Sequence, residues 1–141
     1  MQIIGFNFSK ISAEKKKALD GKIEVKSNLE VKNISPEKIE MIKDKDVLKF
    51  GFEFTIDYTP NVASIAFEGF ILLIVDKEQS KEILKKWKAK KVSDEVRIPL
   101  FNMILTKCNL KALQFEEEFG IPTHIPLPRI NPQQNNQGYV Q

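Results

Sequence analysis

The stretch that decides the fold covers residues 47–75 and reads VLKFGFEFTIDYTPNVASIAFEGFILLIV. Apolar residues alternate with polar or small ones over residues 48–58. Because alternate side chains point to opposite faces of a β-strand, this pattern predicts a strand with one covered face. Pro60 follows in a Thr-Pro-Asn segment that is typical of a turn. Residues 62–75 become apolar on both faces and predict a second strand of a hairpin, with Gly69 at a bulge or a bend.

Two weaker runs of the same period precede this hairpin. In the first, small or polar residues alternate with Ile4, Phe6 and Phe8. In the second, the apolar side is formed by Ile23, Val25, Leu29 and Val31. With the hairpin they predict a four-stranded antiparallel sheet. The connection over residues 35–46 is less regular, since Ser35-Pro36-Glu37 can start a short helix and the charged residues 43–46 indicate a solvated turn.

A helical period replaces the strand period after Asp76. Asp76 and Gln79 have the spacing of a helix N-cap and its partner in the first turn. A narrow apolar stripe at helical spacing follows and consists of Ile83, Leu84 and Trp87. We therefore predict a short Lys-rich helix over residues 77–91.

A longer helix is predicted after it. Ser93-Asp94 offers a cap, and proline is tolerated in a first turn, so Pro99 indicates a helix that becomes regular near Ile98 and continues to Phe119, where Gly120 is placed to end it. One apolar stripe along this helix is formed by Phe101, Leu105, Cys108, Ala112, Phe115 and Phe119. Further apolar residues widen the arc, so the helix needs more than one partner surface.

Three prolines restrict the segment after the long helix. Pro122, Pro126 and Pro128 favour an extended, polyproline-like conformation over residues 121–130. We predict a single domain over residues 1–130 and a disordered Gln/Asn-rich tail over residues 131–141. The predicted fold class is α+β, with a four-stranded antiparallel sheet packed against a long C-terminal helix and a shorter Lys-rich helix.

Composition excludes several classes of protein. Of the 141 residues 42% are apolar and 29% charged, which suits one domain with a core. With one Cys and one His, the chain forms no internal disulfide and no Cys/His metal site of three or four ligands, and we expect no metal and no cofactor. The longest apolar run, residues 70–75, is far shorter than the roughly 20 residues that span a bilayer. We expect a cytoplasmic protein with no integral membrane segment.

Candidates for catalysis are few. His124 lies between prolines with no Ser or Cys near it in the sequence as a nucleophile, and Cys108 lies on the apolar stripe, where a buried thiol packs like a small apolar residue. Residues 116–118 are three consecutive Glu, whose side chains point about 100° apart on a helix, so we interpret them as a solvated face. No glycine-rich phosphate loop is present in the sequence. We expect no catalytic residues and no enzyme activity.

Positive charge is concentrated in the predicted Lys-rich helix. Residues 77–91 contain seven Lys and two Glu, whereas the rest of the chain has 15 basic and 17 acidic residues. Such a helix, with Trp87, can bind nucleic-acid phosphates or an anionic membrane surface. Lysine also solvates the outer face of a helix, and with only two Arg in the chain we favour this interpretation and expect no nucleic-acid partner. Binding of an anionic partner stays the alternative function.

Ten Phe and a long helix with apolar residues on two faces give this small domain surplus apolar surface, which indicates a subunit interface or an exposed groove.

The order of elements is similar to that of the SecB family of export chaperones. Residues 47–75 resemble the family's long hairpin, including a glycine near the middle of the fourth strand. Pro99-Leu-Phe101, the helix after it and the strip over residues 119–130 resemble the family's long helix and the segment that follows it.

The resemblance implies an ATP-independent chaperone-like protein that holds unfolded polypeptides in apolar grooves, assembles as a homodimer or homotetramer, and has a link to protein export. By position, it implies a client-peptide groove at Trp87, Phe101, Ile121, Ile125 and Leu127. Each of these residues can instead pack in a core or a dimer interface. The Lys/Glu alternation of the second strand and the Gln/Asn-rich tail depart from the acidic family pattern, which argues against delivery to the translocase motor.

Overall fold

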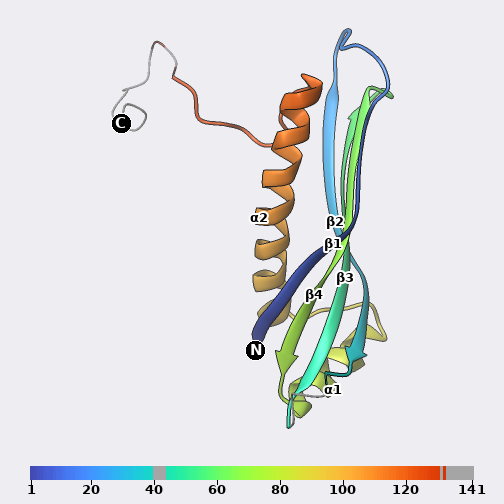
Figure 1. The fold of residues 1–141 in the computed structure, drawn as a ribbon, viewed down its shortest axis with the longest axis vertical. Helices are drawn as coiled ribbons and strands as arrows, with labels where there is room; N and C mark the ends of the chain where they lie inside the picture. The colour runs from blue at the N-terminus through green and yellow to red at the C-terminus, as the bar shows by residue number, and fades with distance from the viewer. Residues whose placement is uncertain (40–43, 131, 133–141) are drawn as a thin grey trace.

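The computed structural model describes residues 1–39, 44–130 and 132. It contains one four-stranded antiparallel sheet and two helices, which confirms the predicted α+β class (Figure 1). The elements in chain order are β1 (Gln2–Lys15), β2 (Glu24–Glu37), β3 (Asp46–Thr59), β4 (Ala63–Val75), α1 (Lys77–Trp87) and α2 (Asp94–Phe119). The predicted tail over residues 131–141 lies outside the described residues, apart from Pro132.

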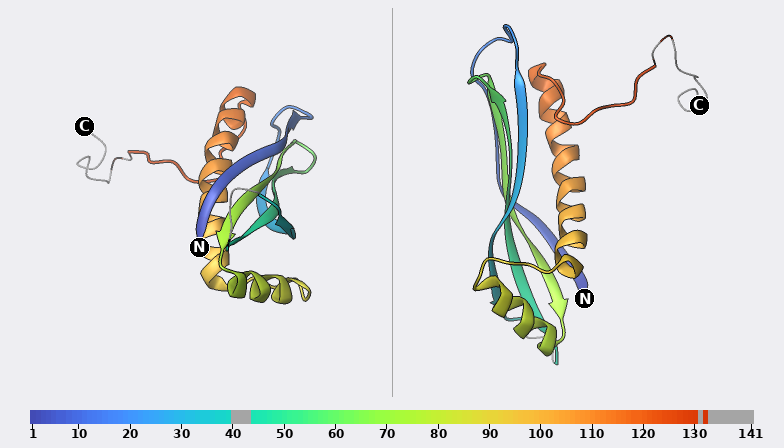
Figure 2. Two further views of the ribbon diagram at one scale, coloured as in Figure 1. Left: turned by 60° about the horizontal axis from the view of Figure 1, so that its bottom comes forward. Right: turned by 180° about the vertical axis from the view of Figure 1, so that it is seen from behind.

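The strands are long and lie in the order β1-β4-β3-β2, so β1 and β2 form the two edges of the sheet. The α2 helix runs along the length of the sheet, whereas α1 lies at one end of it (Figures 1 and 2). Buried residues of both helices belong to the same core as those of β3 and β4. The molecule therefore has one layer of sheet and one layer of helix.

The central hairpin is confirmed with the predicted faces. In β3 the buried side chains are those of Leu48, Phe50, Phe52, Phe54, Ile56 and Tyr58. They pair in register with buried residues of β4, for example Phe54 with Phe67 and Ile56 with Ile65. Pro60 and Asn61, the latter with a φ of 54°, make the turn between the strands. One face of the hairpin therefore carries most of the core.

Gly69 marks an irregularity, but on the neighbouring strand. The register with β1 shifts between Phe8 and Lys10, opposite Gly69, while β4 itself continues without interruption. A Cβ atom at position 69 would collide with the carbonyl oxygen of Asn7 and would lie 2.8 Å from the ring of Phe52. Glycine is thus required here by the close approach of a neighbouring strand and an aromatic ring.

Three local predictions were wrong. Ser35–Glu37 continues β2 and pairs with β3, because pairing with the long neighbouring strand overrides the local helix signal. The α2 helix is regular from Asp94, with Ser93 at the predicted cap, and not from Ile98, because Pro99 removes only the hydrogen bond to the carbonyl of the exposed Glu95, near the helix start. The α1 helix ends at Trp87, and a turn that places Lys90 at a φ of 58° follows it.

The buried stripe of α2 follows a spacing of four residues. Its members are Val96, Leu100, Ile104, Cys108, Ala112 and Glu116. The predicted stripe was right at Cys108 and Ala112, whereas its four other members, Phe101, Leu105, Phe115 and Phe119, are only half-buried at the sides of the helix. The outer side also carries apolar residues, and Leu110 is 62% exposed. Apolar residues occur all round α2, so the sequence is compatible with several apolar stripes. Contact with the sheet determines which of these stripes is buried.

Candidate functional site

A groove of about 450 Å³ runs between the edge strand β2 and the two helices. Its lining includes Trp87 and Phe101, two of the five residues predicted to bind client peptides. The full lining consists of Leu29, Glu30, Val31, Lys32, Trp87, Lys90, Val92, Arg97 and Phe101. The groove thus combines an apolar floor with charged residues on both sides.

The apolar floor comes from segments that are distant in the sequence. Leu29 and Val31 of β2 pair with Phe54 and Phe52 of β3, so their side chains lie on the covered face of the sheet at its edge. Trp87 is the last residue of α1. The turn after α1 then brings the chain back through Val92 to α2, which contributes Phe101.

The two aromatic rings of the groove each lie beside a cation. The Lys90 Nζ atom lies 4.5 Å from the centre of the Trp87 ring, and the guanidinium carbon of Arg97 lies 5.6 Å from the centre of the Phe101 ring. Arg97 also donates a hydrogen bond of 2.8 Å to Asp94. Cation–π contacts of this kind place positive charge directly over apolar surface.

The strand side of the groove carries a mixed pair of charges. Lys32 donates a 3.0 Å hydrogen bond to Glu30, and both side chains are half exposed. This hydrogen bond lowers the pKa of Glu30 and raises that of Lys32, so both groups stay ionised near neutral pH. Among the described residues β2 has a strand neighbour on one side only, so its second edge has backbone donors and acceptors that can pair with an added strand.

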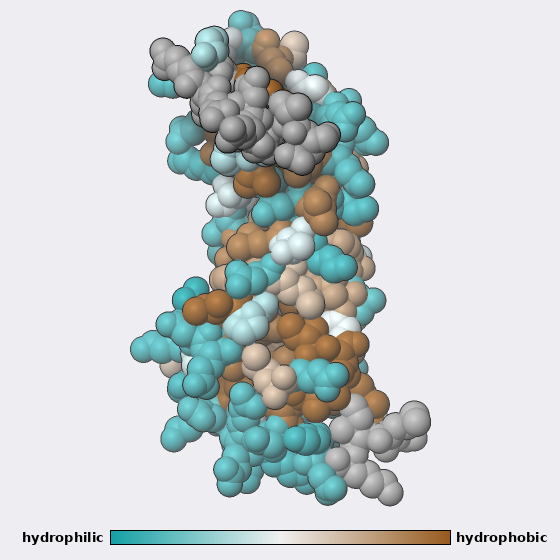
Figure 3. Space-filling model, turned by 90° about the vertical axis from the view of Figure 1, so that its left-hand side faces the viewer, coloured by the Kyte–Doolittle hydropathy of each residue, from teal (hydrophilic) through white to brown (hydrophobic). Residues whose placement is uncertain are grey.

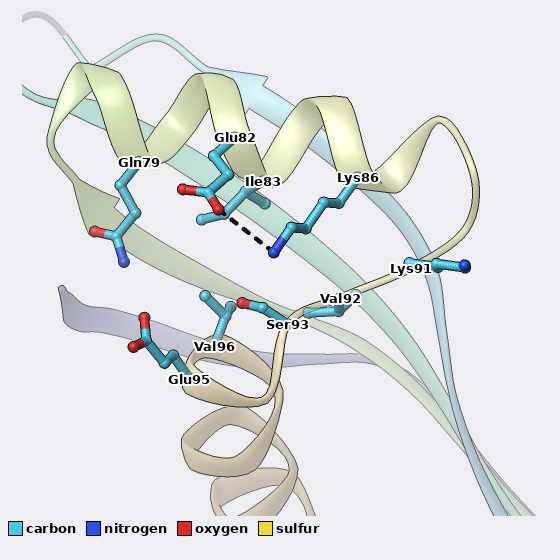
Figure 4. Close-up of a pocket in the computed structure, with 9 residues that line it drawn as sticks. All are labelled: Gln79, Glu82, Ile83, Lys86, Lys91, Val92, Ser93, Glu95 and Val96. Carbon is cyan, nitrogen blue, oxygen red and sulfur yellow. Dashed lines mark ion pairs between the residues drawn. The ribbon is translucent and has the colours of Figure 1, made fainter.

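A smaller cavity of about 230 Å³ lies next to the groove, between α1 and the start of α2 (Figure 4). Val92 lines both the groove and the cavity. Its apolar lining is Ile83, Val92 and Val96, and Glu82 pairs with Lys86 at 3.4 Å along its upper side. The cavity extends the apolar surface of the groove beneath α1.

The other three predicted site residues lie at the opposite end of α2. Phe101 and Phe119 are separated by about 27 Å along a helix that rises 1.5 Å per residue. Ile121, just beyond, belongs to the core and is 6% exposed. Ile125 is half-buried, and Leu127 is 52% exposed. The structure therefore places the five residues in two separate regions, a groove and a C-terminal strip.

A buried polar network fastens this strip to the sheet. The Tyr58 hydroxyl donates to the Glu116 carboxylate, and the carbonyl oxygen of Pro122 lies 2.7 Å from the same hydroxyl. The backbone N–H of His124 donates to Glu116 at 2.9 Å, and the His124 Nδ1 atom lies 3.0 Å from both carboxylate oxygens. The His124 Nε2 atom lies 2.7 Å from Asn109 Oδ1. Burial, followed by the bond to Glu116, raises the pKa of Tyr58 well above its usual value.

This network corrects the interpretation of residues 116–118 as a solvated face. Glu116 is 1% exposed, while Glu117 and Glu118 are exposed. The signal in the sequence was its position four residues after Ala112, on the stripe that contacts the sheet. A carboxylate at that position needs buried donors, and Tyr58 and His124 provide them from segments far apart in the chain.

Cys108 lies in the core, as predicted. Its thiol is fully buried, and burial raises its pKa to about 12. Within residues 1–39, 44–130 and 132, no group of three or more His, Cys, Asp or Glu is placed to hold a metal ion. In the same part of the chain no helix is long and apolar enough to cross a membrane.

Comparisons with known proteins agree with this architecture. No family model matches the chain, and no curated protein matches it. A solved structure of the SecB-like chaperone Rv1957 of Mycobacterium tuberculosis, in complex with a ChAD peptide from the Rv1956 HigA1 antitoxin, is similar with a TM-score of 0.52 and 14% sequence identity. The match covers 94% of this chain and 92% of the other. This chain has a SecB-like fold.

The SecB-like fold also explains why two separate stretches carried the resemblance. Residues 47–75 form the β3–β4 hairpin, and residues 99–130 contain most of α2 and the strip. In space the two stretches meet at the bond between Tyr58 and Glu116 and where the Phe115 ring lies 6.2 Å from that of Phe67. They form the sheet layer and the helix layer of one core.

Proposed function

We propose that this protein is an ATP-independent, non-catalytic chaperone-like protein of the cytoplasm that binds non-native polypeptide segments in the groove beside β2. The observation that carries the proposal is the apolar floor of Trp87, Phe101 and Val31 directly beside a strand edge with no partner strand among the described residues. The SecB-like protein with a similar fold, which was solved with a bound peptide, supports it.

An extended client suits both features of this groove. Its backbone can pair with the free edge of β2, and every second side chain then points to the same side, toward the apolar floor. Backbone pairing needs no particular sequence, and an apolar floor accepts any large apolar side chain. We therefore expect the groove to bind unfolded segments of many sequences. Folded proteins should not bind, because their backbone is already paired.

The C-terminal strip offers a second contact surface. Ile125 and Leu127 leave apolar surface exposed after the end of α2, in the segment whose His124 ring lies 2.7 Å from Asn109 of α2. A longer client can therefore contact both regions of one chain, which increases its affinity through the second contact.

Self-association into a homodimer or homotetramer is part of the proposal. The face that carries α2 shows apolar side chains along its middle and in its lower part (Figure 3). On this helix Ile98 is 50% exposed and Leu110 is 62% exposed. Contiguous apolar surface of this kind commonly forms a subunit interface. A link to protein export is the further part of the proposal that rests on the SecB-like fold alone.

The alternative function is binding of nucleic acid or a membrane surface through α1. It is favoured by one observation, that the lysines of this helix, such as Lys77, Lys81 and Lys85, are exposed. Release of counterions would then make the logarithm of the binding constant fall steeply with the logarithm of the salt concentration. Titration of duplex DNA and anionic vesicles across a salt series separates this function from polypeptide binding.

Suppression of aggregation tests the proposal. Light scattering by a thermally unfolding model protein should fall when the chain is added in equimolar amount, with no ATP present. Trp87→Ala should weaken the suppression, because it removes the largest ring of the groove. Leu19→Ala, which truncates a 42% exposed side chain outside the groove, is the matched control and should suppress like the wild type. Unchanged light scattering with the wild type would contradict the proposal.

A further inference from the structure

The groove has an excess of positive charge on its helix side. Lys90 and Arg97 lie over the rings of Trp87 and Phe101. Arg97 forms an ion pair with Asp94, whereas no ion pair involves Lys90 within the part of the chain that the structure describes. The exposed Lys88 and Lys91 flank Lys90 in the same turn and connection. The strand side has no positive excess, because Lys32 lies 3.0 Å from Glu30 and 3.8 Å from Glu53.

We propose that the groove selects polypeptide segments in which large apolar residues are flanked by Asp or Glu, and rejects segments flanked by Lys or Arg. This inference rests on the proposed function and names its substrate class. It follows from position: a client side chain that contacts either ring lies next to a cation, so the neighbouring client residues meet positive charge. A carboxylate there can pair with Lys90, and an ammonium group there is repelled.

The surrounding charge strengthens this selection. Residues 77–91 contain seven Lys and two Glu, while the Glu82–Lys86 pair beside the groove cancels one of each. The positive charge of the lysines in the turn after α1 is therefore balanced by few nearby carboxylates. Charges within a Debye length of about 8 Å still interact at physiological salt. We expect an acidic peptide to bind about tenfold more tightly than a basic peptide with the same apolar residues.

Peptide titration tests the inference directly. Three synthetic peptides share the same Phe and Leu residues, contain no Trp, and carry Asp, Gln or Lys at the flanking positions. Trp87 is the only tryptophan of the chain, so its emission reports binding inside the groove. The Asp peptide should bind most tightly and the Lys peptide most weakly, and the difference should shrink as salt is added because exposed charges are screened.

Two variants with the same change in net charge test whether the preference for acidic peptides arises at Lys90. Lys90→Glu reverses the charge over the Trp87 ring and should reduce the preference for the Asp peptide by about threefold or more. Lys77→Glu makes the same change at the first residue of α1, about 15 Å along the helix from Trp87, and should keep the preference. An equal loss in both variants would show a general charge effect and would overturn the inference.

The remaining outcomes separate the inference from the proposed function. Equal affinity for all three peptides would overturn selection by charge and leave polypeptide binding intact. Tighter binding of the Lys peptide would do the same. If none of the peptides binds, both the inference and the proposed function fail.

Discussion

Replacing Tyr58 by Phe tests whether the buried network fastens the C-terminal strip to the sheet. The change removes one hydroxyl, which contacts the Glu116 carboxylate and the Pro122 carbonyl, and keeps the ring in the core. A hydrogen bond to a charged group contributes about 1.5–3 kcal/mol, so we expect the free energy of unfolding to fall by about 2 kcal/mol. For a chain of this size that corresponds to a loss of roughly 4–8 °C in Tm.

The assay is urea unfolding followed by Trp87 fluorescence, at one fixed protein concentration because self-association would shift the apparent stability. The midpoint should move and the m-value should not, since the surface exposed on unfolding is the same. Thr106→Val is the matched control, because its exposed hydroxyl bonds only the Asn102 carbonyl of its own helix, and its effect should stay within about 0.5 kcal/mol.

A second variant compares the contributions of Glu116 and Tyr58 to the free energy of unfolding. Glu116→Ala leaves the backbone N–H of His124 without its acceptor, leaves the Tyr58 hydroxyl with the Pro122 carbonyl alone, and opens a cavity, so it should cost more than Tyr58→Phe, about 3–5 kcal/mol. The reasoning is refuted if Tyr58→Phe is as stable as the wild type to within about 0.5 kcal/mol.

Three further predictions follow from single positions. Since the folded Cys108 thiol has a pKa of about 12 against an ordinary 9.0, its contribution to stability should be present below pH 9 and lost toward pH 12, and Cys108→Ala should show a shallower fall in that window. Gly69→Ala should lower the urea midpoint strongly, because its Cβ meets the Asn7 carbonyl, whereas Gly21→Asn, at an open turn with a φ of 73°, should cost little. Leu110→Glu should reduce the oligomeric mass measured by light scattering after gel filtration, and a mass equal to the wild type's would exclude this helix face as the subunit interface.

The hairpin was predictable because its signal is local. Along β3, alternation from Leu48 to Tyr58 fixes both the strand and its buried face without knowledge of any partner. Asp76 was likewise identified as the cap of α1, and its carboxylate accepts from the Gln79 backbone N–H at 2.8 Å. Signals of this kind depend only on residues a few positions apart.

The buried face of α2 and the polar network could not be predicted from the sequence, because both depend on residues that are distant in the chain. Apolar residues surround α2, so the stripe through Leu100 and Ile104 is selected only by the sheet. Glu116 looked solvated because its donors, Tyr58 and His124, are 58 and eight residues away in sequence. The lysines of α1 mostly face water, and the one that lies over the ring of Trp87 belongs to the turn after the helix.

The most direct test of the central claim is a titration of Trp87 emission with an unfolded protein that contains no tryptophan, such as a reduced and carboxymethylated one. Because Trp87 is the only tryptophan of the chain and lines the groove, its emission changes only when that region is affected. We predict a saturable shift with the unfolded form and none with the same protein in its native form. An unchanged emission with the unfolded form, together with no complex by gel filtration, would contradict polypeptide binding in the groove.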